Sequence, residues 1–70
     1  MNKVTYEITK NGWITTVVFE EKTYSEKYEF IDGVAVCVEG NLDKEGLPED
    51  LLKAVVTIDE YNIMYALQKF

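Results

Sequence analysis

The residues that could perform chemistry in this sequence are few, and most of them lack a partner. The 70 residues include no histidine, which is the commonest general base and metal ligand, and no arginine. The only cysteine, Cys37, lies in a valine-rich run typical of a packed strand, and the only serine, Ser25, has no histidine to activate it. Catalytic triads are therefore excluded, and we expect a protein that is not an enzyme and uses no cofactor.

Pairs of carboxylates could still carry out acid–base chemistry, as they do in glycosidases. Glu26 and Glu29 differ in strand parity, so they are expected on opposite faces of a sheet. Asp59 and Glu60 fit the first turn of a helix, where acidic side chains complement the helix dipole. A chain of this length also has little volume for a substrate cleft once its core is filled. Neither pair is predicted to be catalytic.

Oxygen-bearing side chains at Asn41, Asp43 and Glu45, followed by a glycine, resemble the start of an EF-hand calcium loop. The pattern fails further along, because its eighth position is Pro48 and its twelfth is Leu52, where a bidentate Glu is required. The preferred interpretation is an acidic turn before a helix, so no metal site is predicted. Cation binding by these three residues is the alternative.

The remaining functional candidate is the acidic segment of residues 39–60. The chain has 13 acidic residues against seven lysines and a net charge of −6, and seven of the acids but only two of the lysines fall in this segment. Such a surface could imitate the phosphate array of a nucleic acid and block a basic groove, whereas the plainer interpretation is a solvated face that maintains solubility. The predicted partner-binding residues are Glu39, Asp43, Glu45, Glu49, Asp50 and Glu60.

The same charge argues against several other partners. Without arginine or a cluster of lysines, direct nucleic-acid binding is not expected, and an acidic surface is repelled by anionic membranes. A single cysteine cannot form an internal disulfide, and no apolar run has the length of a signal peptide or a membrane span. We therefore expect a cytoplasmic protein whose partner is the basic surface of another protein.

Turn signals and strand periodicity predict the framework that positions these groups. Asn11 and Gly12 are typical of a type I′ hairpin turn, which would pair residue 10 with residue 13. A second turn is expected near residues 21–23, and another type I′ turn at Asp32 and Gly33. The prediction is a single α+β domain, residues 1–70, that begins with a four-stranded antiparallel β-meander. Its core face would collect Val4, Tyr6, Ile8, Trp13, Val17, Phe19, Tyr24, Tyr28, Phe30, Ala35 and Cys37.

One or two C-terminal α-helices are expected to pack on one face of this sheet. Pro48 suits the first turn of a helix. Four β-branched residues at positions 55–58 favour a break, after which Thr57 and Glu60 would form the capping box of a second helix. A single continuous helix is the alternative. The second helix would carry two apolar stripes, Ile58, Tyr61 and Tyr65 and also Ile63, Leu67 and Phe70, with Asp59 and Asn62 among the polar residues.

The sheet face opposite the core is only half polar, which leaves two explanations. Either the fourth strand is buried on both sides by the C-terminal segment, or this face is a subunit interface. A small core without a disulfide or a metal favours a homo-oligomer, most simply a homodimer. The predicted interface residues are Ile14, Val18, Val34, Val36, Val38, Tyr61 and Tyr65. The fourth strand as a free edge is the competing interface.

These properties favour a small acidic protein that binds without catalysis, most simply an inhibitor that blocks a basic macromolecular surface. Phages and mobile elements often encode domains of this size and charge that act against a bacterial host or defence protein, so such an anti-defence protein is expected by association. The alternative is a homo-oligomeric module that binds or sequesters a small ligand between subunits. Capture of a stoichiometric protein partner would favour the inhibitor, and a co-purifying metabolite would favour the ligand-binding module.

Overall fold

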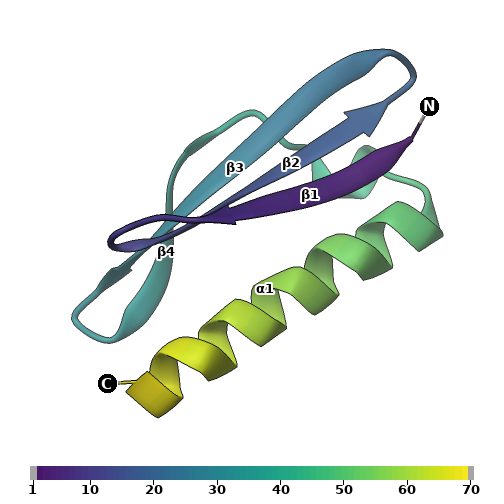
Figure 1. The fold of residues 1–70 in the computed structure, drawn as a ribbon. Coiled ribbons are helices and arrows are strands. Elements are labelled where there is room, and N and C mark those ends of the chain that lie inside the picture. The colour runs from purple at the N-terminus through teal and green to yellow at the C-terminus, as the bar shows by residue number, and fades with distance from the viewer. Residues whose placement is uncertain (1, 70) are drawn as a thin grey trace.

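The computed structural model describes residues 2–69 of the chain, and the side chains of residues 2–65. A four-stranded antiparallel sheet, in the order β1-β2-β3-β4, has one helix against one of its faces (Figure 1). The strands are β1 (Lys3–Ile8), β2 (Gly12–Phe19), β3 (Lys22–Ile31) and β4 (Val34–Gly40), followed by a short 3₁₀ helix, η1 (Lys44–Gly46), and by α1 (Glu49–Lys69). The predicted α+β meander with a C-terminal helix is confirmed.

The C-terminal segment forms one continuous helix of 21 residues, so the predicted break at residues 55–58 is wrong. Thr57 does not cap a second helix, because its Oγ1 donates a hydrogen bond to the carbonyl oxygen of Lys53, one turn earlier, at 2.8 Å. Val55 is fully buried against the sheet. Burial of its side chain outweighs the small helix-propensity cost of β-branched residues, which is a fraction of a kcal/mol each.

The first hairpin does not have the predicted two-residue turn. Ile8 pairs with Trp13, which leaves four intervening residues and shifts the register by two. Neither Asn11 nor Gly12 has a positive φ, so the type I′ turn predicted there is wrong. Gly12 is needed for a different reason, because a Cβ at this position would lie 2.0 Å from the carbonyl oxygen of Tyr28 on β3. The glycine permits close approach of two strands.

The second and third hairpins have two-residue turns. Glu20 and Glu21 both adopt positive φ, 51° and 65°, one residue earlier than the turn predicted at residues 21–23. The third turn lies at Asp32 and Gly33, with φ of 53° and 80°, which confirms the type I′ turn predicted there. The residues that flank it, Ile31 and Val34, pair as predicted.

The helix packs across β1 and β2 on the sheet face that carries Trp13 and Val17. The register shift in the first hairpin is two residues, and side chains alternate with a period of two, so each residue keeps its predicted face. The apolar core consists of Val17, Leu51 and Val55, with Val4, Phe19, Leu42 and Leu47 packed around it. Tyr6, Ile8 and Cys37 belong to the predicted core face but are exposed, because α1 covers only part of this face, including part of β1.

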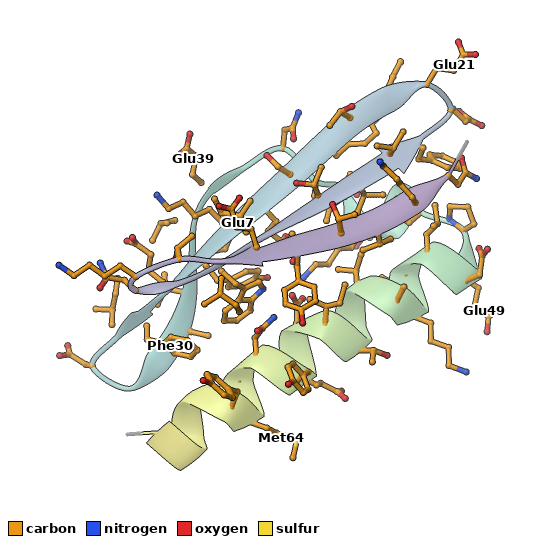
Figure 2. All side chains as sticks on the ribbon, viewed as in Figure 1. Glu7, Glu21, Phe30, Glu39, Glu49 and Met64 are labelled. Carbon is orange, nitrogen blue, oxygen red and sulfur yellow. The ribbon has the colours of Figure 1, made fainter. Side chains whose placement is uncertain are left out.

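The opposite face of the sheet is open over the described residues, and Figure 2 shows Glu7 pointing away from α1 on this side. Ile14 and Val18 are half-buried there, whereas Val34 and Val36 of β4 are exposed. The C-terminal segment therefore does not bury the fourth strand on both sides, because α1 lies on the other face. No helix in the described part of the chain combines the length and hydrophobicity needed to span a bilayer.

Candidate functional site

The turn before α1 and the first turn of α1 form an acidic surface, which we call the acidic end and define as Asp43, Glu45, Glu49 and Asp50. All four side chains are exposed. Asp43 caps η1, because its Oδ1 accepts a hydrogen bond from the backbone N–H of Glu45 at 3.1 Å. Glu49, labelled in Figure 2, and Asp50 lie in the first turn of α1, where negative charge stabilises a helix. The preference of helix starts for acidic residues therefore explains why these carboxylates lie together.

The other two predicted contact residues lie away from the acidic end. Glu39 is exposed on β4 and lies far from Glu49 in the view of Figure 2. Glu60 is exposed on α1, 11 residues after Glu49, which corresponds to about 16 Å along the helix axis. The structure therefore brings four of the six predicted residues together and leaves these two at a distance.

Lys44 lies between residues of the acidic end in the sequence, but its side chain points inward. Its Nζ lies 3.1 Å from Glu26 Oε1 and 3.3 Å from Asp59 Oδ2, and it donates a hydrogen bond to the Tyr28 hydroxyl at 3.0 Å. The Lys44 side chain is only 32% exposed. This lysine therefore compensates carboxylates beneath the surface and leaves the exposed acids beside it uncompensated.

Lys44, its three partners and Trp13 form a polar cluster between the sheet and α1, which we call the buried polar cluster. Trp13 and Glu26 are buried in it, and Tyr28, Lys44 and Asp59 are half-buried. The Trp13 indole stacks on Tyr28 with ring centroids 4.7 Å apart, and its Nε1 donates a hydrogen bond to Asp59 Oδ1 at 3.2 Å. Glu26 is buried on β3. The assignment of Asp59 to the first turn of a second helix is wrong, because α1 is continuous and this carboxylate lies in its middle, directed at Trp13.

Opposing effects set the pKa values of Asp59 and Lys44 in this cluster. Burial raises the pKa of Asp59 above its ordinary value, and the attraction of Lys44 and the Trp13 hydrogen bond offset only part of that rise. Burial acts to lower the pKa of Lys44, but the hydrogen bond with Tyr28 and the interactions with Glu26 and Asp59 outweigh it and raise that pKa. A lysine that acts as a general base needs the opposite shift of its pKa, and the contacts of Lys44 instead join the turn before α1 to the sheet and to α1.

The sequence patterns do not predict the buried polar cluster. One signal was present, since Glu26 shares its strand parity with Tyr24 and Tyr28, and a carboxylate on a buried face needs a partner. Strand parity cannot identify Lys44 as this partner, because Lys44 lies in η1, after the last strand of the sheet. Asn62 was likewise predicted on a polar side of the helix, yet it is only 2% exposed and its Nδ2 donates to the carbonyl oxygen of Ile58 at 2.9 Å.

The residues that resemble a calcium loop have other partners. The side chain of Asn41 accepts a hydrogen bond from the backbone N–H of Ser25 at 3.0 Å, and Asp43 accepts one from Glu45. Among the described residues, no group of three or more Cys, Asp or Glu side chains is arranged to hold a metal ion. The side chains available here serve to fix the backbone between β4 and η1.

A hollow beside the acidic end has a volume of about 100 Å³, well below the roughly 300 to 1,000 Å³ of typical ligand sites. It is lined by Phe19, Tyr24, Leu42, Asp43, Gly46 and Leu47. Its lining is mainly apolar and contributes a single carboxylate. Within one copy of the chain, this hollow is too small to enclose a metabolite.

The predicted oligomer-interface residues fall on two separate surfaces. Ile14, Val18, Val34 and Val36 alternate with the core residues and so lie on the open face of the sheet. Val38 lies at an irregularity of the β3–β4 register, where Tyr28 pairs with Cys37 and Lys27 with Glu39. Tyr61 and Tyr65 are exposed on α1, which covers the opposite face. A single contact that uses all seven residues is therefore not available on one flat surface.

The chain was compared with protein-family models, with curated proteins and with solved structures. None of these three comparisons finds a match. The function must accordingly be inferred from the acidic end, the buried polar cluster and the uncovered parts of the sheet.

Proposed function

We propose that this chain is a binding protein without catalytic activity, whose acidic end docks onto a basic surface of another protein and blocks it. The observation that carries the proposal is the inward position of Lys44. Within the described residues both ion pairs belong to this lysine, and both involve carboxylates of the buried polar cluster. The four carboxylates of the acidic end are exposed and have no ion-pair partner among the described residues.

The acidic end is more negative than the sequence suggests, because the nearest lysine does not offset it. Asp43 caps η1, Glu45 lies in the first turn of η1, and Glu49 and Asp50 lie in the first turn of α1. A concentrated negative field of this kind attracts lysines and arginines over several ångströms and raises the association rate with a basic partner. Grooves that bind nucleic acid present such lysines and arginines.

An inhibitor of this kind acts by occupancy, so it needs no reacting group. The sequence has no histidine to activate Cys37 or Ser25, and the raised pKa of Lys44 disfavours it as a general base. A basic groove covered by the acidic end is closed to its nucleic acid for as long as the complex lasts. By size and charge we propose a bacterial host or defence protein as the target.

The test compares two variants that have the same net charge. In the first, the acidic end is neutralised with D43N, E45Q, E49Q and D50N, which keeps an N-cap residue at position 43. In the second, four exposed acids elsewhere are neutralised with E7Q, E20Q, E21Q and D32N. Exposed charge pairs contribute about 0.2 to 1 kcal/mol each, so losing four should weaken binding by about fourfold to several hundredfold.

Parent and both variants are immobilised and exposed to a bacterial lysate at low salt, and each captured protein is identified and assayed for nucleic-acid binding. We expect the parent and the second variant to capture a nucleic-acid-binding protein that the first variant does not retain. Adding the soluble parent should then displace nucleic acid from that protein, with an effect that weakens as salt rises. Equal capture by all three, or capture without displacement, would contradict the proposal.

A further inference from the structure

The two edges of the sheet differ in how they are protected from other strands. The β1 edge carries Lys3 and Glu7 and lies beside α1. The β4 edge has no charged residue and no proline from Val34 to Val38, and Val34 is 60% exposed. Charges, prolines, β-bulges and covering elements are the usual means by which proteins prevent an edge strand from pairing with another chain. Over this stretch β4 has no charge, proline or cover, and its register irregularity lies at the far end, at Val38.

The backbone groups that β4 offers to a neighbour can be identified from the ladder. The N–H of Phe30 donates to the carbonyl oxygen of Asn11 at 2.8 Å, so it points towards β2 and away from Ala35, its partner on β4. Hydrogen-bonded and non-hydrogen-bonded pairs alternate along an antiparallel ladder. Ala35 and Cys37 therefore direct their backbone N–H and C=O groups outward, where no other described segment pairs with them.

We propose that two copies of the chain pair along β4, antiparallel and related by a two-fold axis at Val36. This register places Ala35 of each copy opposite Cys37 of the other and pairs all of their outward-facing N–H and C=O groups. The central pair, Val36 with its counterpart, is then a non-hydrogen-bonded pair, in which cross-strand side chains approach most closely. Val34 lies opposite Val38, which is at the register irregularity of β4, so valines meet at the centre and at both ends of the paired stretch.

Charge favours a second copy over a basic strand as the occupant. The stretch from Val34 to Val38 is uncharged, so it has no acidic side chain to pair with the lysines or arginines of a basic strand. The same stretch of a second copy is equally apolar and brings no unpaired charge to the contact. In the proposed register Glu39 lies opposite Gly33, and Asp32 lies opposite Gly40, so no two acids face each other across the ladder. Antiparallel pairing also directs the two acidic ends in opposite directions.

The register is tested by disulfide cross-linking in a C37S background, which removes the native thiol. Cα atoms of a non-hydrogen-bonded antiparallel pair lie about 4.5 Å apart, within the disulfide range. V36C is therefore expected to form a covalent dimer under mild oxidation. The matched control is V34C, because its two copies would be offset by four residues, roughly 13 Å, and should remain monomeric on denaturing gels. Equal cross-linking of both variants, or of neither, would overturn the register.

A second measurement distinguishes the edge from the open face of the sheet. Sedimentation of the parent at micromolar concentration should show a dimer, and V36K should convert it to a monomer with an unchanged circular dichroism spectrum. V18K places the same charge on the open face at β2, away from the edge, and should stay dimeric. A monomeric parent, or dissociation by V18K as complete as by V36K, would refute pairing along β4. This inference does not depend on the acidic end, so either proposal can fail alone.

Discussion

The contact between the sheet and α1 has an apolar part and a polar part, and the two are built differently. In the apolar part, Val17 of β2 and Val55 of α1 are fully buried, and Leu51 is nearly so. In the polar part, one turn further along α1, Asp59 meets Trp13 and Lys44. Apolar contacts stabilise without fixing one arrangement, whereas hydrogen bonds and ion pairs require particular partners. We infer that the first part supplies stability and the second sets the position of α1 along the sheet.

The polar part also contains groups that weaken it. The hydroxyl of Thr15, a residue with no exposed surface, and the side-chain oxygen of Asn62 have no hydrogen-bond partner among the described residues. A buried polar atom without a partner costs about 1 to 3 kcal/mol. The net contribution of the polar part to folding is therefore expected to be smaller than its number of contacts suggests.

The largest effect is expected from the apolar part. Val55→Ala removes two methyl groups from a fully buried site and should lower the free energy of unfolding by about 2 kcal/mol. Val56, the next residue, is 40% exposed, so Val56→Ala is the matched control and should change stability by less than about 0.5 kcal/mol. Urea denaturation followed by Trp13 fluorescence measures both. Similar losses for the two variants would show that the helix is not anchored through Val55.

The apolar part could be predicted from the sequence, because it follows from periodicity. Leu51 and Val55 recur at helical spacing, and Val17 shares the strand parity of Trp13, so each local pattern indicates its own buried face. The turn at Asp32 and Gly33 was equally local, since both residues readily adopt positive φ. These elements agree with the structure because neighbours in the sequence determine them.

The polar part could not be predicted, because it depends on where α1 lies along the sheet. Asp59 was assigned to a helix start from its local sequence, and only the continuous helix brings it to Trp13, 46 residues away in the sequence. Tertiary burial of Val55 removed the predicted helix break. The prediction of a type I′ turn at Asn11 and Gly12 was wrong for a related reason, since β3 approaches Gly12 closely and constrains the backbone there.

Within the polar part, the next largest effect is expected at Lys44. Lys44→Met keeps most of the length of the side chain but leaves Glu26 and Asp59 without their counter-charge. Removing one partner of a buried ion pair costs several kcal/mol, and because Lys44 is about one-third exposed we expect a loss nearer about 1 to 2 kcal/mol. Lys53→Met, at an exposed position on α1, is the control and should be nearly neutral.

Thermal unfolding of the two lysine variants against the parent provides the measurement. Adding Glu26→Gln to Lys44→Met should recover part of the loss, because the uncompensated buried charge is then removed. A Lys44→Met protein as stable as the parent would mean that the cluster adds no net stability. In that case the apolar part would account for the fold alone.

The smallest effect concerns the protonation of Asp59. Burial raises its pKa in the folded state above the ordinary value of 3.8, so the folded protein binds this proton more tightly than the unfolded chain does. The contribution of Asp59 to stability should therefore rise as pH falls from neutral towards about 3.8, and then level off. Asp59→Asn does not titrate, although its side-chain oxygen can still accept the hydrogen bond from Trp13.

Urea denaturation of the parent and of Asp59→Asn at several pH values between 7 and 4 tests the direction of this pH dependence. The difference in stability should move in favour of the parent as the pH falls, by an amount smaller than the Lys44→Met effect. Repeating the comparison in a Lys44→Met background should give a steeper change, because the lysine is one of the groups that hold the Asp59 pKa down. If the parent instead loses stability relative to Asp59→Asn on acidification, attraction to Lys44 outweighs burial at this carboxylate, and the polar part stabilises the fold more than its buried unpaired atoms suggest.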